Sequence, residues 1–210
     1  MLRSGVAFDR ETAGPIAVPG AQLEVDFDIE SSAEGRVYLW GFLVHDTTAP
    51  GRPYYRQFSA FDDLDAATET ALAEAALGWL RGMADTALSL RVYHYSGYEP
   101  ATVRALADRG GGPQLRWAAG FADEHFVDLY EVVKTHFFGV KGLGLKLIAQ
   151  HAGFRWRDDD PGGLNSQRWF AEAVHHPAAE VREQARTRVL EYNEDDVRAT
   201  SELRAWLRSR

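Results

Sequence analysis

The stretch EVDFDIESS, at residues 24–32, alternates acidic and apolar side chains along its length. Successive side chains of a β-strand point to opposite faces, so this pattern predicts a strand with one apolar and one acidic face. The apolar face comprises Val25, Phe27 and Ile29. The acidic face carries Asp26, Asp28 and Glu30, whose charges repel one another unless they are solvated, protonated or bound to a cation.

The segments that follow predict an α/β fold. Residues 36–46 are apolar on both faces, as in a strand buried on both sides, and the turn-rich segment 31–35 predicts a hairpin between the first two strands. This order of elements predicts a mixed sheet with helices on its faces. We expect further strands over 53–61, over 88–95 and from 125, helices over 66–85, 100–110, 128–137, 143–153 and 177–207, and a polar loop over 155–166.

The composition indicates one globular domain, with 210 residues of which 45% are hydrophobic. The absence of cysteine excludes disulfides, thiolate zinc sites and cysteine nucleophiles, and it fits a reducing cytoplasm, which is the expected location. No apolar run is long enough for a secretory signal or a membrane span, so we expect no membrane partner. Residues 1–20 contain several glycines and prolines, and we interpret them as an N-terminal extension or linker remnant before a domain over 21–210.

The net charge of −8 bears on the class of partner. It argues against a protein that holds nucleic acid by a broad basic face. It is compatible with a site that binds divalent cations through carboxylates, because bound metals reverse the local potential.

Acidic residues also stand at two other positions. Glu99 follows the strand predicted over 88–95, and Tyr192 and Asp196 lie four residues apart on one face of the C-terminal helix. Each signal alone is weak: Asp28 and Glu30 on a strand favour a solvated face, and Glu99 near a helix N-terminus is favourable for the helix dipole.

Together, these acids resemble the DEDD superfamily of 3′–5′ exonucleases, in its tyrosine-bearing subgroup. The resemblance covers residues 24–207 and implies a ribonuclease-H-like fold with a mixed five-stranded sheet and helices on both faces. It implies two divalent cations, Mg²⁺ or Mn²⁺, that are held by four acids and hydrolyse nucleic acid from its 3′ end. By motif, the catalytic residues are Asp28, Glu30, Glu99, Tyr192 and Asp196, of which all but the water-orienting tyrosine are metal ligands.

Three phrases, VYHYSGYEP at 92–100, LGLKLIAQHAGFRW at 143–156 and YNEDDVRAT at 192–200, are similar to the C-terminal module of predicted bacterial RecB-like nucleases. That similarity implies an upstream nuclease or helicase domain as a partner. The second motif ends in Tyr98-Glu99, where the superfamily usually has Phe-Asp, so the reach of this acid differs from the family pattern.

Other polar residues predict local roles. Lys146 and Trp156 are the main candidates for substrate binding, through phosphate contact and base stacking. We expect Asp26 and Asp195 to be solvent-exposed acids and His94 to be a packed strand residue or a hydrogen bonder at the edge of the site. Asp128 is expected to cap a helix.

The leading hypothesis is a metal-dependent 3′–5′ exonuclease that acts on single-stranded nucleic acid, with DNA favoured over RNA. The alternative is a non-catalytic nucleic-acid-binding or scaffolding module of a larger helicase–nuclease. Two features favour it, namely the glutamate at the second motif and the negative net charge.

Overall fold

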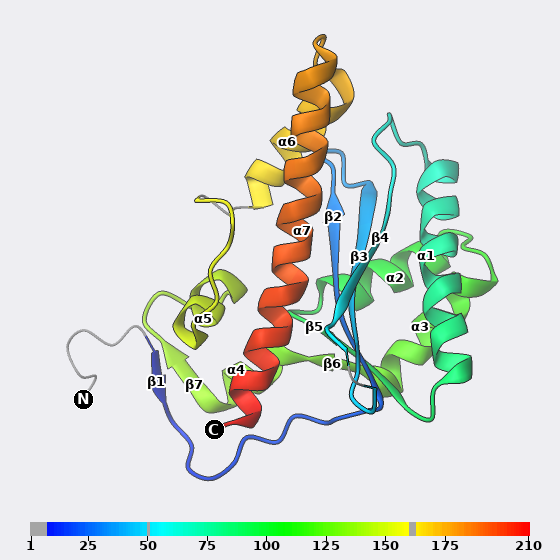
Figure 1. Ribbon diagram of the computed structural model, residues 1–210. Coiled ribbons are helices and arrows are strands. Elements are labelled where there is room, and N and C mark those ends of the chain that lie inside the picture. The colour runs from blue at the N-terminus through cyan, green and yellow to red at the C-terminus, as the bar shows by residue number, and fades with distance from the viewer. Residues whose placement is uncertain (1–7, 50, 160–162) are drawn as a thin grey trace.

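A five-stranded mixed sheet forms the centre of the fold in the computed structural model, which describes residues 8–49, 51–159 and 163–210. Strand β2 lies in the middle, with two antiparallel strands on one side of it and two parallel strands on the other (Figure 1). The strand order is β4-β3-β2-β5-β6, with β2 at Leu23–Ser31, β3 at Val37–Asp46, β4 at Tyr54–Ser59, β5 at Leu90–His94 and β6 at Phe126–Asp128.

Helices cover both faces of this sheet (Figure 1). One face carries α1 at Ala66–Thr86, α2 at Tyr98–Asp108 and α3 at Pro113–His125. The opposite face is crossed by the long helix α7 at Ala179–Arg208, which is flanked by α5 at Leu145–Ala152 and α6 at Gly163–His175. Helix α4, at Leu129–His136, follows β6. The mixed five-stranded sheet with helices on both faces is therefore confirmed.

The alternation of β2 places its two kinds of side chain as predicted. Val25, Phe27 and Ile29 are buried and pack in one apolar cluster with residues of α1, α2 and α3. The acidic residues of the strand consequently face α7. This arrangement puts every carboxylate of the strand under the last helix of the chain.

Two helices of the structure lie outside the sequence predictions. Helix α3 occupies a segment without an expected element. It begins at Pro113 after three glycines, and the side chain of Glu74 accepts hydrogen bonds from the amides of Gln114 and Leu115. Helix α6 begins at Gly163, inside the predicted loop 155–166, of which residues 160–162 lie outside the described part of the chain.

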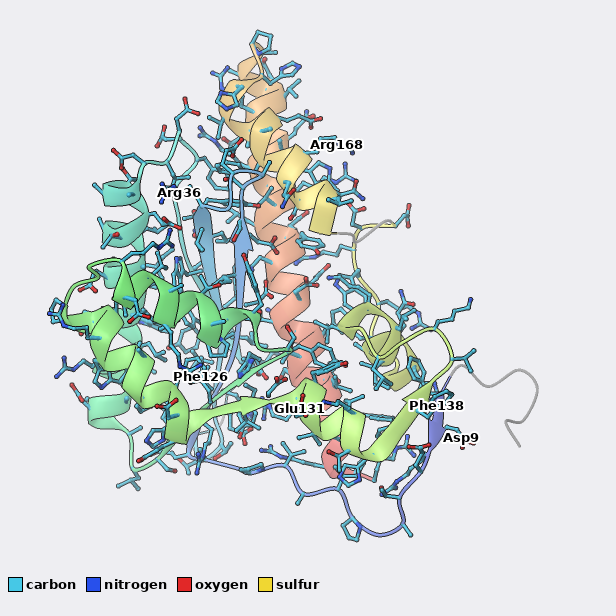
Figure 2. The ribbon with its side chains drawn as sticks, turned by 180° about the vertical axis from the view of Figure 1, so that it is seen from behind. Asp9, Arg36, Phe126, Glu131, Phe138 and Arg168 are labelled. Carbon is cyan, nitrogen blue, oxygen red and sulfur yellow. The ribbon has the colours of Figure 1, made fainter. Side chains whose placement is uncertain are left out.

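The described part of the N-terminal segment packs against the domain. Strand β1, at Phe8–Arg10, pairs antiparallel with β7, at Phe137–Gly139, so that Asp9 lies opposite Phe138 (Figure 2). Further along, the Tyr93 hydroxyl donates to the carbonyl of Pro19 at 2.6 Å. The origin of residues 1–20 as a linker stays a prediction, and residues 1–7 lie outside the described chain.

Among the described helices, none combines the length and the apolar character that a membrane crossing requires.

Candidate metal centre

The acidic face of β2 has two halves, which differ in the residues of α7 that lie above them: the first half holds Glu24 and Asp26, and the second holds Asp28 and Glu30. In the first half, Arg204 contacts both Glu24 and Asp26, with Nη2 at 2.7 Å from Asp26 Oδ2, and Arg208 lies 2.7 Å from Glu24 Oε1. Two guanidinium groups thus balance two buried carboxylates. This half is a structural ion-pair network.

The burial of Asp26 corrects a sequence prediction. Asp26 was expected to be an exposed strand acid, but its exposed fraction is 0%. The reason is Arg204, which comes from the far end of the chain and supplies two hydrogen bonds to the carboxylate. Pairing with a guanidinium group offsets the free-energy cost of burying a charged carboxylate.

The second half of the acidic face has a different composition. Asp28 and Glu30 of β2 meet Asp196 of α7, and one carboxylate oxygen from each lies within 4.8 Å of the other two. Glu30 and Asp196 are buried and Asp28 is partly buried. Three like charges are thereby held close together at a place with little water.

This crowding changes the protonation of the acids. Burial raises the pKa of Asp28 well above its ordinary value, and the neighbouring charges of Glu30, Asp196 and Glu99 add to the rise. Burial likewise raises the pKa of Glu30 to about 8, with a further contribution from Asp196. The pKa of Asp196 is also raised by burial. A bound cation would relieve the repulsion between the three carboxylates in place of protons. Their carboxylate oxygens are hard ligands of the kind that Mg²⁺ and Mn²⁺ prefer.

Glu99 lies in the first turn of α2 and is not part of this three-carboxylate group. The Glu99 side chain is buried, and its Oε2 atom makes no hydrogen bond within the described chain. The Nδ1 atom of His94 lies 3.6 Å from this oxygen. His94 is a packed strand residue, as expected, and its Nδ1 donates to the carbonyl of Ser96 at 2.6 Å. A buried carboxylate oxygen without a hydrogen-bond donor is the kind of atom that a cation satisfies, so Glu99 fits a metal site.

The two predicted substrate-binding residues lie at this centre and contact a carboxylate. The Lys146 ammonium of α5 forms an ion pair with Asp196, and Trp156 Nε1 donates to Asp196 Oδ1 at 2.6 Å. The ammonium also lies 4.4 Å from the ring centroid of Tyr192. Lys146 is therefore a counter-charge of the acidic group, and it partly offsets the rise in the pKa of Asp28.

Tyr192 stands one helical turn before Asp196 and is buried. Burial raises the pKa of its hydroxyl far above the ordinary value of 10, and the charge of Asp196 adds to this rise. The phenol therefore stays protonated at neutral pH and acts as a hydrogen-bonding group rather than as a base.

Two residues that contact the metal centre carry no strong signal in the sequence. Asn193 Nδ2 donates to Asp28 Oδ2 at 2.7 Å, and Ser166 Oγ donates to Glu30 Oε2 at 2.8 Å. Asn193 is adjacent to Tyr192 in the sequence, which is the only hint of its role. Ser166 lies on α6, a helix that the sequence analysis does not predict.

Asp195 corrects another prediction. It was expected to be exposed, but it is buried, and its carboxylate accepts from the Arg157 backbone amide at 2.7 Å and from Arg157 Nε at 2.9 Å. The same arginine contacts Glu194. These contacts fasten the segment that carries Trp156 to α7. Asp128 caps α4 as predicted, accepting from the amide of Tyr130 at 2.8 Å.

A mixed α/β sheet with carboxylates from its central strand and its last helix defines a fold of the ribonuclease-H-like class. The family model described as RNase_H superfamily matches residues 25–208, and the chain therefore belongs to the ribonuclease H superfamily. Members are usually nucleases that act on nucleic acid with divalent metals. No curated protein and no solved structure matches this chain.

The raised pKa of Glu30 predicts that the metal-free protein loses stability as the pH rises from about 4.5 to about 8. Glu30 titrates at its ordinary value of 4.5 in the unfolded chain and at about 8 in the folded protein. Across this interval the folded state binds the additional proton, so raising the pH favours unfolding. Below 4.5 both states are protonated, and the group contributes no difference.

The measurement is the thermal midpoint of metal-free wild type and Glu30→Gln across this pH interval. The glutamine variant lacks the titrating group, so its midpoint should fall less steeply with pH. Parallel pH curves for the two proteins would contradict the raised pKa.

Proposed function

We propose that this protein is a metal-dependent 3′–5′ exonuclease that hydrolyses single-stranded nucleic acid, with DNA preferred to RNA. The observation that carries the proposal is the convergence of Asp28, Glu30 and Asp196 beside Tyr192. Membership of the ribonuclease H superfamily supports hydrolysis of nucleic acid. The resemblance to the tyrosine-bearing exonucleases supports the direction of attack.

The proposed ligands are Asp28, Glu30, Asp196 and Glu99, which together hold two divalent cations, Mg²⁺ or Mn²⁺. When bound, these ions neutralise the phosphodiester, lower the pKa of a water molecule and stabilise the leaving 3′-oxygen. Tyr192 orients the water through its protonated hydroxyl. Asn193 and Ser166 hold Asp28 and Glu30 in place by hydrogen bonds.

The surface beside Tyr192 supports access by a nucleic-acid strand. A cleft of about 430 Å³ opens there, with Arg157, Thr187 and Arg188 among its lining residues. The same cleft is also lined by the acids Asp158, Glu183, Glu191 and Asp195. Arg157 and Arg188 are ion-paired with three of these acids, so their guanidinium groups contact phosphate by exchanging those partners. The similarity of three phrases to RecB-like nucleases supports a nuclease or helicase domain that acts together with this one, and the absence of cysteine supports a cytoplasmic location.

The test is an oligonucleotide labelled at its 5′ end and incubated with the protein and Mg²⁺ or Mn²⁺. The proposal expects a ladder that shortens from the 3′ end, faster for DNA than for RNA, and no products when EDTA removes the metal. Labelled fragments of intermediate length as the first products would indicate an endonuclease, and immediate release of the labelled mononucleotide would indicate attack from the 5′ end. Binding without any cleavage would favour the scaffolding module.

Lys146 has a second proposed role, as a phosphate contact. Its ammonium pairs with Asp196, and a cation held by Asp196 would compete for this carboxylate and leave the ammonium available to a phosphate. We expect Lys146→Met to weaken oligonucleotide binding in the presence of Ca²⁺, a divalent cation used here to hold the complex without turnover. One phosphate contact fewer should reduce the slope of log affinity against log salt by about 1.

Fluorescence anisotropy over a salt series measures this slope. The control is Lys134→Met, because Lys134 is exposed on α4 and pairs with Glu131. An unchanged slope in Lys146→Met would show that Lys146 makes no phosphate contact.

A further inference from the structure

Asn193 is fully buried between α7 and the sheet and is held at both ends of its amide. Its Nδ2 donates to Asp28 Oδ2 at 2.7 Å, and its Oδ1 accepts from the Tyr55 hydroxyl at 2.7 Å. The side-chain amide has a donating end and an accepting end, and these partners occupy both. With the phenol donating to the oxygen, the nitrogen must face Asp28.

The neighbouring strand β3 makes room for this amide at Gly41. Gly41 lies opposite Asp28 on β2 and opposite Gln57 on β4. Gln57 is two residues after Tyr55 on the same strand. A Cβ atom on Gly41 would stand 1.7 Å from Asn193 Oδ1 and 2.7 Å from its Cγ. No side chain fits at position 41 while Asn193 keeps its place.

The glycine is unusual for its surroundings. Strand β3 is buried along most of its length, and its other residues near this point are Trp40 and Phe42, both with an exposed fraction of 0%. Glycine weakens the interior of a strand, and its occurrence there marks a close approach by another group. Here that group is the amide of Asn193.

We infer that Asn193 is a positioning residue for Asp28: Tyr55 sets the orientation of the amide, Gly41 gives it space, and the amide holds the carboxylate in the orientation that ligates a cation. The inference deepens the proposed metal-dependent reaction and rests on the same metal centre. Groups that orient a metal ligand by hydrogen bonding typically contribute about 10–100-fold to metal affinity or activity.

The competing interpretation is that Asn193 only fills space between α7 and the sheet. The geometry separates the two interpretations, because a space-filling role does not require the amide to be aligned with both Tyr55 and Asp28. The two interpretations also differ in what the variants should lose: a space-filling role predicts lower stability with Mn²⁺ affinity unchanged in the folded protein, whereas a positioning role predicts weaker Mn²⁺ binding.

The experiment is a calorimetric titration of Mn²⁺ into wild type, Asn193→Ala, Gly41→Ala and the double variant, without oligonucleotide. We expect Asn193→Ala to weaken Mn²⁺ binding about tenfold. Gly41→Ala should weaken it by a similar factor, because the new methyl group displaces the amide. The double variant should bind no more weakly than Asn193→Ala, because the space left by the amide accommodates the methyl group.

A matched control is Gly120→Ala, on α3, where a new Cβ atom meets no atom within 4 Å, and Mn²⁺ binding should not change. Tyr55→Phe should give a Mn²⁺ affinity between those of wild type and Asn193→Ala. If Asn193→Ala fails to fold, Gly41→Ala and Tyr55→Phe carry the same test. A weakened affinity in a variant whose thermal midpoint is close to that of wild type supports positioning over space filling.

Two results would overturn the inference: wild-type Mn²⁺ affinity in folded Asn193→Ala, or losses from Asn193→Ala and Gly41→Ala that multiply in the double variant. Because no substrate is present, these outcomes are distinct from a failure of the proposed function. That failure would appear as wild-type protein that binds Mn²⁺ and cleaves no oligonucleotide.

Discussion

Asp28→Asn should reduce hydrolysis of a single-stranded oligonucleotide by about a thousandfold or more. Asp28 sits in the three-carboxylate group and is the member that the charges of both Glu30 and Asp196 act upon. Loss of a metal ligand removes several kcal/mol of transition-state stabilisation, and about 4 kcal/mol corresponds to a factor of about a thousand. The rate is measured under single-turnover conditions with Mg²⁺ and with Mn²⁺.

The same substitution should leave the metal-free fold intact and raise its thermal midpoint. Asparagine removes one of three crowded negative charges, and its carbonyl can still accept from Asn193 Nδ2. Glu131→Gln is the control, since Glu131 lies on α4 (Figure 2) and its side chain is 60% exposed. Wild-type rates in Asp28→Asn would remove this residue from the reaction.

Arg204→Met should lower the free energy of unfolding by about 3–5 kcal/mol, the usual cost of breaking a buried ion pair from one side. The substitution leaves the buried carboxylate of Asp26 without its arginine partner and removes one of the two arginines that pair with Glu24. The Arg204 side chain is only 4% exposed. Denaturation in guanidinium chloride measures the loss. Arg208 remains to balance part of the charge on Glu24.

Arg198→Met on the same helix is the matched control. Arg198 is 40% exposed and pairs with Glu194 one turn away, so its loss should cost less than about 0.5 kcal/mol. Neutral replacement of both acids, Glu24→Gln and Asp26→Asn, in the Arg204→Met background should recover much of the stability. A loss below about 1 kcal/mol for Arg204→Met alone would show that the network is not the main support of this half of β2.

The strand alternation at 24–32 was sufficient to predict which side chains of β2 join the apolar cluster, because the direction of a strand side chain depends only on local geometry. The same periodicity could not separate Asp26 from Asp28. Both side chains point to α7, but Asp26 forms an ion pair with Arg204, whereas Asp28 faces the carboxylate of Asp196. That difference depends on residues more than 160 positions away in the chain.

The partners of the acids were harder to predict than the acids themselves. Asn193 reaches Asp28 only because α7 lies across β3 at Gly41. Ser166 reaches Glu30 from α6, a helix that begins inside a segment with the sequence of a polar loop. Lys146 and Trp156 were predicted to contact substrate, and in the structure both contact the Asp196 carboxylate. Sequence motifs therefore predicted the acidic residues of the site, whereas the residues that hydrogen-bond to them depend on tertiary packing.

The most direct test of the central claim is a crystal structure of the wild-type protein grown or soaked with Mn²⁺, with data collected for its anomalous signal. The account predicts anomalous peaks between the carboxylates of Asp28, Glu30 and Asp196, with Glu99 at the edge of the site. Fully occupied Mn²⁺ elsewhere and none among these three carboxylates would contradict it.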